Sequence, residues 1–225
     1  LLLALWIGVA VSTAVDLQKR IIGGTQCGQG ERHYHVKLNV TNGTHSFFCG
    51  GSLISDQWIL TAAHCYERKM YAINQTYSSD NPAQEGETVK EGQTVQIAGH
   101  AATAGGPNGE RIAGESATLQ CADVEVVTCK DLNDYFLATF PNFHNKMAYQ
   151  HWFCGQRAGV DTCKGDSGGG VVYDNKIYGV ISAGDADYVC RSASAFMDVC
   201  NQNYLKWIKD TIKKPRKKCG LNCWS

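Results

Sequence analysis

The sequence carries no excess of charge of either sign. Its 225 residues include 21 Lys and Arg and 21 Asp and Glu, and the basic residues concentrate only in Lys213–Lys218. A dedicated nucleic-acid-binding protein normally presents an overall basic face, so the balance argues against nucleic acid as a partner. The basic run is interpreted as a solvated helix end favoured by the helix dipole, with a docking patch for acidic polysaccharides as the alternative.

Apolar runs long enough to cross a membrane are also missing. The first 15 residues, LLLALWIGVAVSTAV, are apolar, but a spanning helix needs roughly 20 such residues. Small residues at Ser12, Thr13 and Ala14 complete the pattern of a secretory signal peptide. We predict a signal peptide at residues 1–14, with a membrane anchor as the alternative, and no stable membrane insertion once it is removed.

Metal-site spacing is lacking as well. No His/Cys pairing has zinc spacing, and Cys219-x₃-Cys223 alone is a weak signal. Eleven cysteines behind an export signal instead predict disulfides formed in an oxidising compartment. Glycosylation sequons begin at Asn39, Asn42 and Asn74. We therefore expect a secreted, extracellular glycoprotein with no metal and no cofactor.

Short β-branched and aromatic runs, separated by glycine and asparagine turns, predict an all-β fold. Leu205, Ile208 and Ile212 lie at helical spacing and predict a C-terminal helix. The polar stretch 77–92 has no periodicity and is interpreted as a loop. The expected strands cover residues 35–40, 52–61, 94–99 and 117–127, and a hairpin spans 171–181 around Asp174-Asn175.

Two motifs carry the residues of nucleophilic catalysis. In GDSGG, at 165–169, glycines let the backbone turn sharply, so that the N–H groups of Gly165 and Ser167 can converge as in an oxyanion hole. In ILTAAHC, His64 follows an apolar run and precedes Cys65. Taken singly, the first motif also fits a glycine-rich surface turn, and the second fits a structural histidine.

A third motif, Lys19-Arg-Ile-Ile-Gly-Gly24, indicates a cleavage site. Cleavage after Arg20 would free an ammonium at Ile21, and a buried ammonium needs a carboxylate partner. Asp166, beside Ser167, is available for that role. The alternative is that Lys19 and Arg20 form an ordinary solvated pair.

Together, IIGG, TAAHC, GDSGG and Cys49-Gly-Gly-Ser-Leu-Ile-Ser closely resemble the trypsin/chymotrypsin-like serine proteases. The resemblance implies a two-barrel fold with a C-terminal helix over residues 21–214, an activation propeptide at 15–20 and a basic, cysteine-containing tail at 215–225. It makes Ser167 the nucleophile, His64 the general base, and Gly165 and Ser167 the oxyanion-hole donors. Ile21, once freed, would pair with Asp166.

The resemblance also assigns a specificity pocket. Asp161 matches the position at the pocket base that selects Lys or Arg, because a buried anion attracts a cation strongly; a loop aspartate is the alternative. The walls would be Ser182, Gly184 and Ser194. This sequence departs from the family at Ala183, usually Trp, and at Ser194, usually Gly. The Ser194 hydroxymethyl should narrow the slot and cap Asp161.

One member of the family's triad is missing from the pattern. No aspartate between His64 and Ser167 precedes the apolar run that the family requires, and Asp80 is the best stand-in. On the order of forty residues that relatives carry are absent near residues 77–92, including strands that close the first barrel. We therefore expect the first barrel to be incomplete.

The resemblance pairs eight cysteines and leaves three competing for one bond. The odd ones are Cys200, Cys219 and Cys223. The implied pairs are Cys49–Cys65, Cys163–Cys190, Cys27–Cys121 and Cys129–Cys154.

Two functions remain in competition. One is a secreted serine endopeptidase that cleaves peptides or proteins after Lys or Arg and meets protease inhibitors. The other is a catalytically impaired homologue that binds peptides, inhibitors or partners without cleaving them. A third reading, a disulfide-rich structural or adhesive module, leaves His64, Ser167 and the activation site unexplained.

Overall fold

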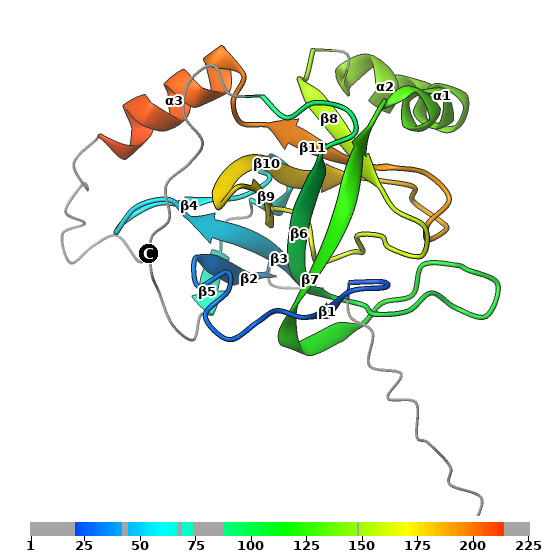
Figure 1. Cartoon of the computed structure of the whole chain (residues 1–225), viewed down its shortest axis with the longest axis horizontal. Coiled ribbons are helices and arrows are strands. Elements are labelled where there is room, and N and C mark those ends of the chain that lie inside the picture. The colour runs from blue at the N-terminus through cyan, green and yellow to red at the C-terminus, as the bar shows by residue number, and fades with distance from the viewer. Residues whose placement is uncertain (1–20, 42–44, 67–68, 74–87, 148, 214–225) are drawn as a thin grey trace, which may run out of the picture.

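Two antiparallel sheets form most of the computed structural model (Figure 1), which describes residues 21–41, 45–66, 69–73, 88–147 and 149–213. The expected signal peptide, propeptide and tail lie outside the described residues, as do Asn42, Asn74 and Asp80. Within the described residues no helix is long and apolar enough to span a bilayer.

The first sheet has the strand order β4-β3-β2-β5. Its strands are β2 (His35–Thr41), β3 (Ser46–Leu53), β4 (Ile59–Leu60) and β5 (Lys69–Ile73). Val36, Leu38 and Val40 alternate along β2 and are buried in one hydrophobic cluster, as expected for a strand with one face in the core. In the described part of the chain this sheet stays open at β4 and β5, in agreement with the expected incomplete first barrel.

The second sheet has the order β1-β7-β6-β9-β10-β11-β8, and a further pairing of β7 with β8 closes it into a barrel. A second cluster, which includes Ile97, Val124 and Phe196, fills this barrel. The strands are β1 (Thr25–Gln26), β6 (Thr94–Ala101), β7 (Glu115–Val127), β8 (Trp152–Gln156), β9 (Gly170–Tyr173), β10 (Lys176–Ala183) and β11 (Ser194–Asp198).

The predicted hairpin of the second sheet has a recognisable turn. Asp174 and Asn175 join β9 to β10 with φ values of 45° and 57°. Positive φ at both central residues is the geometry of the tight hairpin turn that Asn and Asp tolerate. The strand expected over residues 52–61 was wrong in extent, because Ile54–Trp58 forms a turn between β3 and β4.

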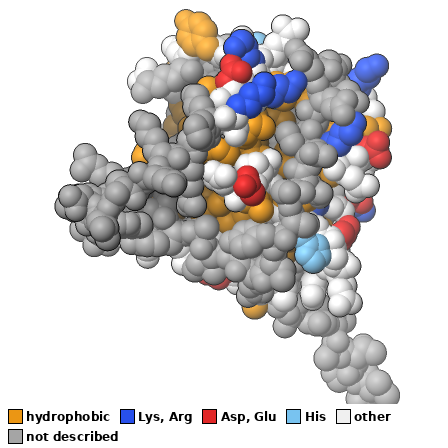
Figure 2. Space-filling model, turned by 90° about the vertical axis from the view of Figure 1, so that its left-hand side faces the viewer, with side chains coloured by type: hydrophobic (Ala, Val, Ile, Leu, Met, Phe, Trp, Pro, Cys, Tyr) orange, Lys and Arg blue, Asp and Glu red, His pale blue; other side chains and the backbone are white. Residues whose placement is uncertain are grey.

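In the part of the chain that the structure describes, three α-helices lie at the edges of the sheets (Figure 1). The expected C-terminal helix is α3 (Gln202–Ile212), where the Asn201 side chain accepts a hydrogen bond from the backbone N–H of Asn203 at 3.1 Å. The other two, α1 (Lys130–Thr139) and α2 (Pro141–Met147), were not predicted. On the side where α3 and β4 lie, hydrophobic side chains reach the surface between residues drawn in grey (Figure 2).

Three of the four expected disulfides are present: Cys27–Cys121, Cys49–Cys65 and Cys129–Cys154. The fourth expected disulfide, Cys163–Cys190, is not formed, and both residues are free thiols. The Cys163 sulfur instead lies 3.8 Å from the carbonyl oxygen of Ile112. Burial raises the pKa of both thiols.

Candidate active site

The segments that carry His64 and Ser167 adjoin strands of different sheets and lie next to each other where the sheets join. His64 lies in η1 (Ala63–Cys65), just after β4, and Ser167 lies in the turn before β9. The backbone N–H of Gly50 in β3 donates to the Ser167 carbonyl oxygen at 2.7 Å. The sulfur of Cys65, next to His64, lies 3.5 Å from the same oxygen. The structure therefore brings the two motifs to one place.

The imidazole of His64 lacks the support that a triad needs. The residue is exposed, yet neighbouring protein desolvates the ring enough to lower its pKa. Among the described residues, no carboxylate raises that pKa and no hydrogen bond joins the ring to the Ser167 hydroxyl. A neighbouring carboxylate would stabilise the imidazolium, so the described part of the site holds two members of the triad.

The glycines around Ser167 are required by the backbone. Gly165 has φ 115°, and a Cβ there would lie 2.3 Å from the Phe48 ring. Gly168 has φ 89°, and a Cβ there would lie 2.2 Å from the carbonyl oxygen of Gly50. Only glycine adopts such torsions at little cost. The dense glycine pattern therefore serves a tight turn packed against β3.

Two N–H groups in this turn remain available. The N–H groups of Asp166, Gly168 and Gly169 donate to the carbonyl oxygens of Cys163, Ile181 and Asp166, respectively. The N–H groups of Gly165 and Ser167 have no acceptor among the described residues. These two are the expected oxyanion-hole donors, and their availability fits that expectation.

Asp166 is fully buried before any cleavage. Its carboxylate accepts backbone hydrogen bonds from Ala101 and Cys163, each at 2.9 Å. Burial raises its pKa to about 6 despite these bonds. Ile21 is also fully buried, with φ 43°, and in the described part of the uncut chain no hydrogen bond joins it to Asp166.

Of the three expected pocket walls, Ser182 and Gly184 line a cavity of about 170 Å³ next to Ser167, and Ser194 does not. Ser182, Ala183 and Gly184 form one side of it. Ser194 is buried and its hydroxyl donates to Asp161 at 2.9 Å, so the predicted cap on Asp161 is confirmed.

Asp161 already has a cationic partner, which the sequence analysis missed. The Arg111 guanidinium lies 2.6 Å from the Asp161 carboxylate, and the two side chains are 5% and 2% exposed. Burial raises the pKa of Asp161, and Arg111 is the strongest opposing influence. Arg111 is 50 residues away along the chain in an irregular loop, so no spacing rule could have found it.

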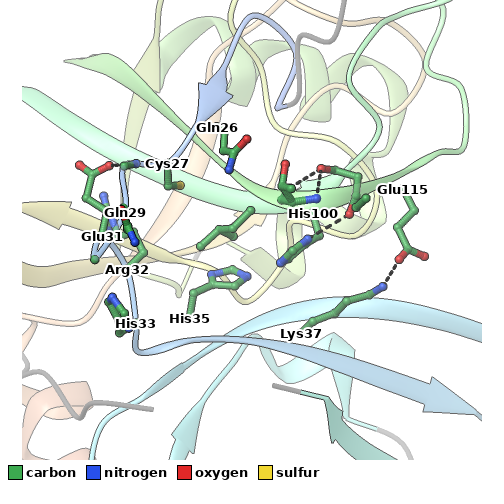
Figure 3. Close-up of a pocket in the computed structure, with 16 residues that line it drawn as sticks. Gln26, Cys27, Gln29, Glu31, Arg32, His33, His35, Lys37, His100 and Glu115 are labelled. Atoms are coloured by element: carbon green, nitrogen blue, oxygen red, sulfur yellow. Dashed lines mark hydrogen bonds and ion pairs between the residues drawn. The ribbon is translucent and has the colours of Figure 1, made fainter. Parts of the chain in front are cut away.

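A separate hollow of about 690 Å³ shares no lining residue with the Ser167 cavity. The rings of His35 and His100 face each other in it with centroids 5.7 Å apart, and Lys37 pairs with Glu115 beside them (Figure 3). Burial, His100 and Arg32 lower the pKa of His35 to about 3. No group of three metal-ligating side chains occurs in the described residues, here or elsewhere.

Sequence comparisons identify the family of this chain. The trypsin family model matches residues 21–95 and 72–208. Serine protease 1 of Rattus norvegicus is 29% identical over 252 positions, which cover 94% of this chain and 97% of that protein. Trypsin V-A of Rattus norvegicus is 30% identical over 248 positions, covering 91% and 94%. Both alignments are longer than the chain's 225 residues, so these relatives carry residues that this chain lacks.

Solved structures share the fold at lower identity. The scabies mite inactivated protease paralogue S-D1 matches with a TM-score of 0.69 and 19% identity, covering 87% of this chain and 100% of that one. Neuropsin, a serine protease expressed in the limbic system of mouse brain, matches with a TM-score of 0.64 and 22% identity, covering 84% and 98%. The His64 and Ser167 motifs lie together between two sheets, and the trypsin family model matches most of the chain. This chain therefore belongs to the trypsin family.

Proposed function

We propose that this chain is a catalytically impaired member of the trypsin family that binds peptides, inhibitors or protein partners and cleaves them slowly at most. The observation that carries the proposal is the state of His64, which has no carboxylate partner among the described residues. Replacing that carboxylate by an amide in a protease with this triad lowers turnover about 10⁴-fold. The pairing of Asp161 with Arg111 adds a second departure from a working site.

The residues that remain would support both steps of acyl transfer, which are formation and hydrolysis of the acyl-enzyme. The Ser167 oxygen would bond to a substrate carbonyl carbon while His64 takes the hydroxyl proton. The N–H groups of Gly165 and Ser167 would stabilise the resulting oxyanion. His64 would then return the proton to the departing amine, and water would release the acyl group by the same steps. Without an orienting carboxylate, each proton transfer is slow.

The second candidate is a secreted endopeptidase that cleaves after Lys or Arg. It is favoured by the buried carboxylate of Asp161 behind the cavity at Ser167. For this candidate, an Asp161→Ser variant should shift the preference away from Lys and Arg in a peptide-cleavage assay. Equal cleavage after Phe or Leu by the unmutated chain would contradict it.

Either function would operate outside the cell. Secretion is proposed from the apolar start of the sequence, which has the pattern of a secretory signal peptide. Glycosylation is proposed at Asn39, Asn42 and Asn74. Asn39 is exposed on β2, as an acceptor must be. Zymogen activation is proposed at the Arg20–Ile21 bond, with protease inhibitors and protein substrates as partners.

Active-site labelling tests the main proposal. The chain, cut after Arg20, should react with diisopropyl fluorophosphate at Ser167 about 10³-fold more slowly than rat serine protease 1. Mass spectrometry of the labelled peptide gives the rate, and Ser167→Ala provides the blank. Rapid stoichiometric labelling would contradict the proposal. If an Asp80→Ala change then abolished that labelling, Asp80 would be the substitute carboxylate.

A further inference from the structure

The specificity pocket of this chain contains an arginine of the chain itself. Arg111 lies in the loop between β6 and β7, and its side chain is almost fully buried. Its Nε donates to the Asp185 carbonyl oxygen at 2.5 Å, one Nη donates to the Thr162 carbonyl oxygen, and the other lies 2.6 Å from Asp161 Oδ2. A guanidinium so fully paired is held in one position.

Asp161 has no oxygen left for an incoming cation. One carboxylate oxygen accepts from the Thr162 N–H at 2.8 Å and from the Ser194 hydroxyl at 2.9 Å. The other accepts from Arg111 and from the Cys190 N–H at 2.8 Å. Arg111 lines the cavity next to Ser167 and Asp161 does not. The arginine therefore stands between the carboxylate and any substrate.

The backbone also fixes Arg111 in place. The N–H of Arg111 donates to the Asp187 carbonyl oxygen at 2.7 Å, and the preceding residue, Glu110, forms an isolated bridge with Tyr188. A Cβ on Gly184, in the pocket wall, would lie 3.5 Å from the Arg111 guanidinium. Because the loop is tethered to the pocket, the guanidinium competes at a high effective concentration with any free ligand.

We propose that Arg111 is the specificity-determining residue of this chain: it acts as an internal ligand of Asp161 and excludes Lys and Arg side chains from the pocket. The remaining cavity of about 170 Å³ then accepts only small uncharged groups, since the buried pair beneath it is neutral as a whole. The proposal concerns binding and does not depend on how fast Ser167 reacts.

Benzamidine, a flat cation that mimics an arginine end group, provides the test. Isothermal titration calorimetry should show binding to an Arg111→Ser variant at least about 100-fold tighter than to the wild-type chain, because the internal competitor is gone. Adding Asp161→Asn to that variant should abolish the gain. Benzamide, which is neutral and forms no ion pair with Asp161, should show no such gain in affinity for the Arg111→Ser variant. Arg157→Ser, which removes an exposed arginine, is the matched control and should behave as wild type.

Equal benzamidine affinity in wild type and Arg111→Ser would overturn the proposal, as would a folded variant that binds no benzamidine. If removal of Arg111 destabilises the variant, benzamidine should supply the missing cation and raise its melting temperature, which it should not do for wild type. Exchange of the Arg111 Nε–H, followed by NMR in the wild-type chain, decides independently of any variant. Exchange as fast as that of Arg157 would overturn the proposal. These results stay separate from Ser167 labelling, so either proposal can fail alone.

Discussion

Single buried side chains set the electrostatic character of this protein. Asp161, Asp166 and His35 are all at least nine-tenths buried, but each has different neighbours. Asp161 pairs with the Arg111 guanidinium, and Asp166 accepts hydrogen bonds from backbone N–H groups. The ring of His35 lies next to the ring of His100. The sequence located Asp161 and Asp166 through their distance from Ser167. It could not reveal Arg111, because a tertiary contact across 50 residues leaves no local pattern.

His35 should make the protein sensitive to acid. Its pKa falls from 6.5 to about 3 on folding. Between these two pH values His35 is therefore protonated in the unfolded chain and neutral in the folded chain. Stability should therefore fall as the pH drops from 6.5 towards 3, by about 1.4 kcal/mol per pH unit from this residue. Urea unfolding of His35→Gln across this range should show a shallower dependence by that amount.

The His35→Gln variant must be compared with the unmutated chain, because Asp166 changes the pH dependence of stability in the opposite direction. Its folded pKa is raised to about 6 from 3.8, so its contribution is full below pH 3.8 and is lost as the pH rises through 6. His33→Gln, which changes an exposed histidine, is the matched control. An unchanged pH dependence in His35→Gln would contradict the assignment.

At the scale of elements, strands were easier to foresee than helices. Alternating apolar residues in β2 and the Asp174-Asn175 turn carry their own local signals. The helices α1 and α2 do not, because aromatic residues such as Phe136 and Phe143 also favour strands. Their helical form depends on packing: the rings of Phe136 and Phe143 contact each other with centroids 5.0 Å apart, and Phe136 also meets Trp152 of β8.

The stability of helix α3 should depend measurably on Asn201, the residue that caps its start. The Asn201 side chain caps an N–H that the helix itself leaves unpaired. An Asn201→Ala change should lower the free energy of unfolding by about 1 kcal/mol, measured by chemical denaturation. Lys206→Ala, which removes an exposed pair with Asp210 on the same helix, should cost clearly less, because solvent screens exposed ion pairs. Equal losses would contradict the role of the cap.

At the scale of the whole molecule, the site depends on how the two sheets meet. β3 supplies Gly50, whose N–H binds the Ser167 carbonyl oxygen and whose own carbonyl oxygen accepts from the Thr61 hydroxyl at 2.8 Å. The family motifs predicted this meeting. They could not predict how the first sheet would hold His64, because relatives carry residues that this chain lacks and the motifs contain no information on how the chain is arranged without them.

Activation cleavage should yield one new N-terminus, at Ile21. Mild trypsin treatment should cut after Arg20 and leave a chain of 205 residues, the 225 of the sequence less the first 20, beginning at Ile21. N-terminal sequencing identifies the product, and Arg20→Gln should block it. A different first residue in the product would refute the zymogen assignment.

The strained backbone of Ile21 favours cleavage of the Arg20–Ile21 bond over its re-formation. A β-branched residue at φ 43° is a true conformational outlier, and such a torsion stores on the order of 1–3 kcal/mol. The angle φ is defined by the carbonyl carbon of the preceding residue, so hydrolysis of the Arg20–Ile21 bond abolishes the torsion together with its cost. Cleavage therefore releases the torsional strain at this residue. Re-forming the peptide bond would restore that strain, so the energy of the torsion favours the cleaved chain.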